Sequence, residues 1–179
     1  MLEYGRNNNK LFGGNYMIVK IISYSKIIVD FINEIKNDFS NGNLFLFPSL
    51  DEIYSNNRRI TFAYIDNNAI IGMISIIIDE VTETSQYLQN LYKSKVIHLD
   101  YIVVKKEYQR KKIGTQLMNE IENYIYSSIT KSIIYSTVSP INSQSLQFHF
   151  SNKFMGIKYI ENYYGFPRIL MVKKYEKSL

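Results

Sequence analysis

The chain has 179 residues, which suits one domain, and 46% of them are hydrophobic, enough to build a sizeable core. The absence of cysteine excludes disulfides, thiolate metal ligands and cysteine nucleophiles, and two isolated histidines argue against a zinc site. The net charge of +5 comes from scattered lysines and arginines, so it predicts a solvated basic surface rather than a nucleic-acid partner.

The sequence also predicts where the domain begins and where the protein resides. Residues 1–16, rich in asparagine and glycine, show no periodic pattern and are expected to form a loose leader before a single domain at 17–179. The longest nearly apolar stretch, residues 69–78, is far shorter than the roughly 20 residues of a membrane helix, and the N-terminus lacks the apolar core of a signal peptide. We therefore expect a cytoplasmic protein without a membrane partner.

Hydrophobic periodicity and turn residues predict the elements of the first half. They are a strand at 17–23, an amphipathic helix at 25–37, a short helix opened by a capping box at 49–52, strands at 60–65 and 69–78, and a polar loop or short helix at 79–95. Asp66-Asn67-Asn68 separates the two β-rich runs, so we expect them to form an antiparallel hairpin.

The same signals predict the elements of the second half. They are a strand at 96–104, a basic turn, a helix of about fifteen residues from Ile113, a strand at 132–138, a helix at 142–152, and closing strands at 157–163 and 168–174. This order predicts an α/β domain of three layers, in which helices flank one mixed, mostly antiparallel sheet.

The basic turn before Ile113 has the features of an anion site. A strand that runs through a short loop into a helix presents unpaired backbone N–H groups at the positive end of the helix dipole. Gly114 leaves room for a phosphate to approach the backbone, and Thr115 can cap the helix. Three cations precede them at 110–112. Because most basic turns are only solvated, the feature by itself does not establish a site.

Two motifs resemble those of the GNAT superfamily of N-acetyltransferases. Residues 102–117 are similar to its main signature, an apolar strand followed by Tyr-(Gln or Arg)-x-x-Gly-x-(Gly or Ala), although Lys112 stands where the family usually has its first glycine. Residues 142–149 look like the family's Asn-x-x-Ala-x-x-Phe-Tyr helix, and Lys153 follows where a glycine is common. The resemblance covers residues 17–174 and implies a GNAT-like fold.

The resemblance also implies an activity and a cofactor site. It implies direct transfer of an acetyl group from acetyl-CoA to a primary amine of a small molecule or peptide, without a metal. In this family the strand before the loop splays from its neighbour and pairs with pantetheine, while the loop holds the pyrophosphate. The cofactor-binding residues so implied are Ile102, Val103, Val104, Gln109, Arg110, Lys111, Lys112, Ile113, Gly114, Thr115 and Asn142.

Candidate catalytic residues follow from the same resemblance. Asp100 lies where family members often carry Glu, and strand alternation puts His98 on the same face, about 6 to 7 Å away. Either could accept the amine proton, or both could be strand residues without a catalytic task. His149 falls where the family usually has a Tyr that donates a proton to the CoA sulfur. A packing role is equally open for it, with Tyr135, Tyr163 and Tyr164 as substitute donors.

The sequence leaves several alternatives open. The departures at Lys112, Lys153 and His149 motivate a second hypothesis, a non-catalytic CoA-binding or interaction module on the same fold. Aromatic residues in 37–49, in 79–95 and near Gly165 would suit an amine with an apolar body, but core packing explains them as well. The sequence leaves open which amine is the acceptor and whether the protein forms a homodimer.

Overall fold

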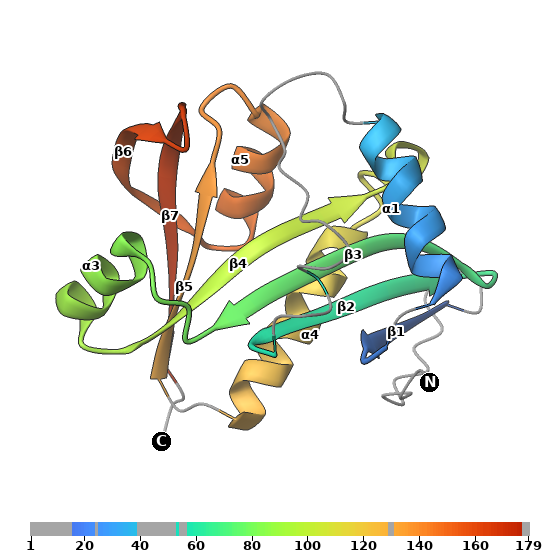
Figure 1. Ribbon diagram of the computed structural model, residues 1–179, viewed down its shortest axis with the longest axis horizontal. Coiled ribbons are helices and arrows are strands. Elements are labelled where there is room, and N and C mark those ends of the chain that lie inside the picture. The colour runs from blue at the N-terminus through green and yellow to red at the C-terminus, as the bar shows by residue number, and fades with distance from the viewer. Residues whose placement is uncertain (1–15, 24, 39–52, 54–56, 129–130, 177–179) are drawn as a thin grey trace.

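The computed structural model describes residues 16–23, 25–38, 53, 57–128 and 131–176 (Figure 1). The strands are β1 (Tyr16–Ile21), β2 (Arg59–Asp66), β3 (Ala69–Ile78), β4 (Lys95–Val104), β5 (Lys131–Val138), β6 (Met155–Tyr163) and β7 (Phe166–Glu176). The helices are α1 (Lys26–Asp38), α3 (Glu83–Tyr92), α4 (Ile113–Ser128) and α5 (Ser143–Ser151), with a short 3-10 turn at Lys106–Tyr108.

The strands form one seven-stranded sheet in the order β1-β2-β3-β4-β5-β7-β6. Each neighbouring pair is antiparallel except β4 and β5, which run parallel. Helices α1 and α3 cover one face, at opposite ends of it, and α4 lies behind the other face (Figure 1). The predicted three-layer architecture with a mixed, mostly antiparallel sheet is confirmed.

Local sequence explains most of these elements. Ile28, Ile32 and Ile35 are fully buried on one side of α1, as the helical spacing predicted. Asn67 and Asn68 take positive φ angles of 47° and 64°, the conformation that a tight hairpin turn between β2 and β3 requires. The predicted hairpin is confirmed.

Several boundaries differ from the predictions. β1 begins at Tyr16, so the last residue of the predicted leader is part of the sheet. Residues 79–95, expected to be a loop or a short helix, contain α3, because Thr82 and Ser85 form a reciprocal capping box at its start. The rest of the leader and the helix predicted to open at 49–52 lie outside the described residues, and the domain assignment stays a prediction.

The two faces of the sheet differ in how continuously they are packed. Under α4 lies one apolar core that spans β2 to β7. On the opposite face the apolar residues form two separate clusters, one under α1 and one under α3. Polar side chains occupy the space between these two clusters, among them Arg59, Ser75, His98 and Asp100. The candidate site borders this polar gap.

Candidate active site

The site is built where β4 and β5 separate. Their parallel pairing runs from Lys95 and Ser132 to His98 and Tyr135, although β4 continues to Val104. A bulge begins at the same level, because Ser75 of β3 pairs with Tyr101 while Ile76 pairs with Leu99, which leaves Asp100 as the extra residue. Beyond His98, β4 therefore has no strand partner on its β5 side among the described residues.

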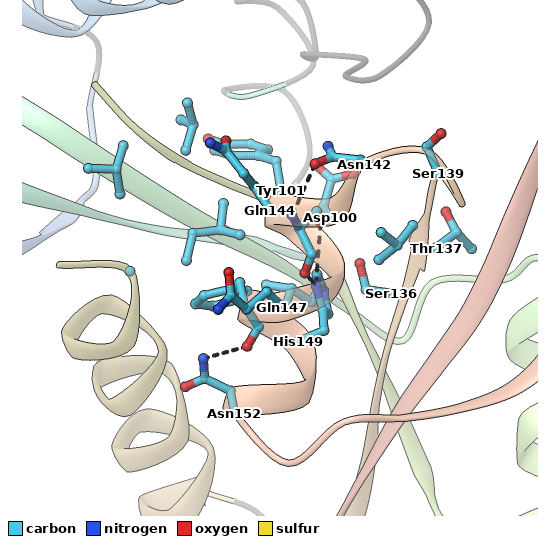
Figure 2. Close-up of a pocket in the computed structure, with 18 of the residues that line it drawn as sticks. Asp100, Tyr101, Ser136, Thr137, Ser139, Asn142, Gln144, Gln147, His149 and Asn152 are labelled. Carbon is cyan, nitrogen blue, oxygen red and sulfur yellow. Dashed lines mark hydrogen bonds between the residues drawn. The ribbon is translucent and has the colours of Figure 1, made fainter. Parts of the chain in front are cut away.

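A cavity of about 1360 Å³ occupies this opening. Its wall includes the loop before α4, the diverging parts of β4 and β5, the start of α5 and the polar gap between α1 and α3. Figure 2 shows polar side chains from the end of β5, Ser136 and Thr137, around the same space as Asn142 and His149 of the α5 segment. One cavity thus connects the α4 loop to the opposite side of the sheet.

The loop before α4 has the backbone of a tight, glycine-like turn. Arg110 and Lys112 both take φ angles of 62°, in the left-handed region that glycine occupies most readily. Lys112, which stands where the family pattern has a glycine, therefore adopts a conformation that glycine favours. The Gln109 side chain donates to the Val104 carbonyl at 3.1 Å, which ties the loop to the end of β4.

The side chains of this loop divide into exposed cations and a buried anchor. Arg110, Lys111 and Lys112 are exposed at the start of α4, whereas the Ile113 side chain is buried and offers a ligand only its backbone. The Lys111 ammonium lies over the Tyr108 ring, 4.8 Å from its centroid. All predicted cofactor-binding residues except Lys111 line the cavity.

Gly114 has a packing reason that sequence reasoning missed. A Cβ at this position would lie 3.2 Å from Cε2 of Phe148 and 3.5 Å from Cδ1 of Ile102. The missing side chain therefore lets α4 approach α5, besides leaving the helix start open to a ligand. Only the tertiary contact between the two helices could reveal this.

Asn142 begins α5 and lines the cavity. Its Oδ1 accepts a hydrogen bond from the Ser145 backbone at 3.0 Å, as a helix N-cap does. With the oxygen engaged, the side-chain NH₂ is the group that can serve a ligand. This orientation suits a carbonyl acceptor on the bound molecule.

Asp100, a predicted catalytic residue, is engaged by another side chain. Its carboxylate forms an ion pair with Arg59, whose side chain is 6% exposed and also reaches Ser75 Oγ at 3.3 Å. The carboxylate is therefore held by a buried guanidinium instead of being left for a substrate amine. The catalytic role of Asp100 stays a prediction, and the geometry favours the structural alternative.

His149, the predicted proton donor, is 2% exposed and packs edge-on against Phe148 and Phe154. Its Nδ1 lies 2.7 Å from the Ser145 carbonyl, which can only accept, so Nδ1 carries the ring proton. Burial lowers the pKa of the imidazole despite this hydrogen bond, and the neutral ring has no proton at Nε2. The donor role stays a prediction, and the geometry favours packing.

A second cluster at the opening was not predicted as a unit. The Tyr135 hydroxyl donates to Oε2 of Glu80 at 2.7 Å, and His98 Nδ1 lies 2.8 Å from the same oxygen. The rings of His98 and Tyr135 are stacked, with centroids 4.5 Å apart. The sequence analysis placed Glu80 only within the polar loop or short helix expected at 79–95. The signal that joins these residues is the register of β4 on β5, which is a tertiary property.

Burial, the first influence on Glu80, raises the pKa of its carboxyl. The hydrogen bond and charge of His98, the hydrogen bond from Tyr135 and the charge of Arg59 outweigh it, so the pKa lies below its ordinary value. Burial and the neighbouring carboxylate raise the pKa of Tyr135. At neutral pH the cluster therefore holds an ionised carboxylate and a protonated phenol.

Two features are absent from the described part of the chain, a cluster of metal ligands and a membrane-spanning helix. Within residues 16–23, 25–38, 53, 57–128 and 131–176, no three His, Asp or Glu side chains gather as metal ligands would. No helix in that part of the chain is both long and apolar enough to cross a membrane.

A family model described as the acetyltransferase (GNAT) family matches residues 29–156. No curated protein matches the sequence. Among solved structures, Arabidopsis thaliana NAA60 in complex with a bisubstrate analogue is similar, with 16% sequence identity and a TM-score of 0.69. The match includes 88% of this chain and 98% of the NAA60 chain. Arabidopsis thaliana Naa50 with the bisubstrate analogue CoA-Ac-MVNAL is 18% identical over 88% and 99%, with a TM-score of 0.63.

An aminoglycoside acetyltransferase from an uncultured soil metagenomic sample, in complex with sisomicin, is also similar in structure. It is 16% identical over 83% of this chain and 94% of its own, with a TM-score of 0.62. At these identities the likeness shows the fold. The molecules bound in the Naa50 and aminoglycoside acetyltransferase structures differ, so they do not identify the acceptor of this protein.

Proposed function

The chain belongs to the GNAT family of acetyltransferases, which use acetyl-CoA, and we propose that it transfers the acetyl group directly to a primary amine at the opening between β4 and β5. The observation that carries this proposal is the single cavity that joins the α4 loop to the polar gap on the other face of the sheet. Two substrates that enter from opposite sides would meet there, without a covalent enzyme intermediate.

The residues present fit a CoA pyrophosphate at the start of α4. Backbone N–H groups at a helix start are unpaired within the helix, and the exposed cations at 110–112 add positive charge. The β4 backbone at 102–104 has an open edge for the pantetheine arm, and the Asn142 amide can donate to one of its carbonyls. Bound there, acetyl-CoA supplies the thioester that the amine attacks.

Two of the departures from the family pattern, Lys112 and Lys153, do not support a non-catalytic module. Lys112 takes a φ of 62° and Lys153 a φ of 66°, so both lysines adopt left-handed conformations that glycine favours. These two substitutions therefore give no reason to favour binding without turnover over catalysis.

The charges of the acceptor side favour a monoamine. Arg59 neutralises Asp100, and Arg168 brings a second, buried guanidinium to the cavity wall. Glu80, whose direct partners are a phenol and an imidazole rather than a guanidinium, is the other acid of this wall, so a single ammonium group suits the wall better than the several positive charges of an aminoglycoside. Tyr164, which is exposed at the cavity rim, offers an apolar surface. We therefore propose a small-molecule or peptide amine with one ammonium group and an apolar body.

Thermal unfolding with and without acetyl-CoA tests the cofactor site first. A ligand at 100 times its Kd that binds only the folded state adds about 2.7 kcal/mol to stability, so the Tm should rise. An unchanged Tm at millimolar CoA would refute the proposal.

Thiol release then tests the acceptor class. The panel holds phenylethylamine, a short peptide with a free N-terminus and an aminoglycoside, with the alcohol analogue of phenylethylamine as the matched control. We expect turnover with a monoamine and none with the alcohol. Preference for the aminoglycoside would contradict the assigned acceptor class.

A further inference from the structure

We propose that His98 takes the proton from the acceptor amine, and that Glu80, held by Tyr135, orients its ring and stabilises the imidazolium. This inference rests on the proposed acetyl transfer and names the residue that makes the amine nucleophilic. Asp100, its neighbour on β4, is not needed for that step.

The position of His98 in the sheet carries the first step of the inference. His98 and Tyr135 form the last parallel pair of β4 and β5, so both rings lie at the apex of the opening. Both side chains belong to the face with the polar gap between α1 and α3. A substrate that enters this gap reaches the apex from the side opposite the α4 loop.

The contacts of His98 fix which ring nitrogen is free to accept a proton. Nδ1 is enclosed and lies 2.8 Å from Oε2 of Glu80, somewhat off the direction of the ring N–H. An unprotonated Nδ1 would set two acceptors against each other at this distance, so Nδ1 carries the proton. The lone pair of the neutral ring is then at Nε2.

Nε2 of His98 remains accessible. The His98 side chain is 11% exposed and lines the cavity, and Nε2 is neither enclosed nor hydrogen-bonded among the described residues. Stacking on Tyr135, at an interplanar angle of 6°, holds the ring plane. The ring is thus held on one side and open to a ligand on the other.

The charges that face this pair come from several strands. Glu80 receives the Tyr135 hydroxyl from β5 and feels Arg59 of β2, while Tyr163 of β6 lies close enough to feel Glu80. Asp100 of β4 is paired with Arg59. Glu80, whose direct partners are Tyr135 and His98, is therefore the carboxylate beside the imidazole, as in a carboxylate–histidine pair that stabilises a transient imidazolium.

The proton balance follows from this arrangement. The acceptor arrives as an ammonium ion and gives one proton to Nε2 of His98, which becomes an imidazolium. The neutral nitrogen forms a bond to the acetyl carbon as the carbon–sulfur bond breaks. The second nitrogen proton leaves with the thiolate as free thiol, and His98 returns the first proton to solvent.

The main test compares His98→Gln with the matched variant His149→Gln across pH. We expect His98→Gln to lower kcat by about 10²-fold or more and to abolish the rise of rate with pH that deprotonation of a histidine produces. His149→Gln should keep this rise. Both should keep the Tm increase on binding CoA, which separates a failure of this inference from a failure of the proposed function.

A second variant covers a His98→Gln protein that does not fold. Glu80→Gln removes the charge beside the imidazole, so kcat should fall and the rise of rate should move to lower pH, while the Tm increase on binding CoA is kept. Full kcat with an unmoved pH rise in Glu80→Gln, or a full rate with the pH rise intact in His98→Gln, would overturn the inference.

Discussion

The two histidines of the chain border the same cavity but have opposite surroundings. His98 contacts a carboxylate through Nδ1 and keeps Nε2 toward the cavity. His149 contacts a backbone carbonyl through Nδ1, and its Nε2 is enclosed without a partner among the described residues. A carboxylate stabilises an imidazolium far better than a neutral carbonyl does, so what lies behind the ring decides which histidine can exchange protons.

The two acids of the site repeat this contrast. Asp100 faces a permanent cation, Arg59, and its charge is compensated. Glu80 faces a phenol and an imidazole, so its negative charge is compensated in full only when His98 is protonated. Asp100 and His149, which the sequence analysis favoured as catalytic residues, are thus the acid and the histidine that the structure makes less reactive.

Replacing Asp100 with Asn should have the largest effect on stability. The variant leaves the buried Arg59 without its carboxylate, which costs about 3 kcal/mol, the lower end for a broken buried pair because Asp100 is 20% exposed. Urea unfolding measures this loss. The double variant Arg59→Met with Asp100→Leu should recover most of it. If folded Asp100→Asn loses the rise of rate with pH, Asp100 and not His98 is the proton acceptor.

Replacing Gly114 with Val should affect both folding and cofactor binding. Its Cβ would crowd the Phe148 ring next to His149, so we expect a loss of about 2 kcal/mol, typical of overpacking, and weaker CoA binding. Gly114→Ala should show a smaller loss of both. Calorimetric titration with CoA checks the affinity, and an unchanged Kd in the folded Val variant would place the phosphate site elsewhere.

Replacing His149 with Phe should change the pH dependence of stability more than turnover. Burial lowers the folded-state pKa of His149, so below about 6.5 the unfolded chain binds a proton that the folded chain does not. Wild-type stability should therefore fall as pH drops below that value, and the Phe variant should lack this part of the fall.

Glu80 does not affect the comparison of wild-type and His149→Phe stability between pH 5 and 6.5. Its pKa is also lowered by folding, but its contribution is lost only as pH falls below its ordinary value of about 4.5. Unfolding free energies across this window provide the test. A His149→Phe protein with normal CoA affinity and a large loss of kcat would restore the donor role for His149.

Replacing Lys112 with Gly should have the smallest effect. Glycine adopts the left-handed conformation without the side-chain penalty, so we expect a gain of up to about 1 kcal/mol, partly offset by backbone entropy. Lys153→Gly is the matched control, because it relieves the same conformation after α5, away from the α4 loop. Weaker CoA binding in Lys112→Gly alone would identify Lys112 as a phosphate ligand.

Sequence patterns predicted the elements well where local chemistry sets them. The paired asparagines of the β2–β3 turn and the apolar stripe of α1 are local signals, and both predictions are confirmed. Boundaries were less accurate. Strands β6 and β7 extend beyond the predicted 157–163 and 168–174, because pairing across the hairpin continues past the apolar runs.

The sequence by itself determined the family, the order of the strands, and the basic loop before α4, because these depend on periodicity and on residues adjacent in the chain. The tertiary structure alone decided which ionisable groups are compensated. Arg59 reaches Asp100 across 41 positions, and Tyr135 reaches Glu80 across 55. The reactivity of a side chain depends on its neighbours in space, and strand register, which no local pattern encodes, sets those neighbours here.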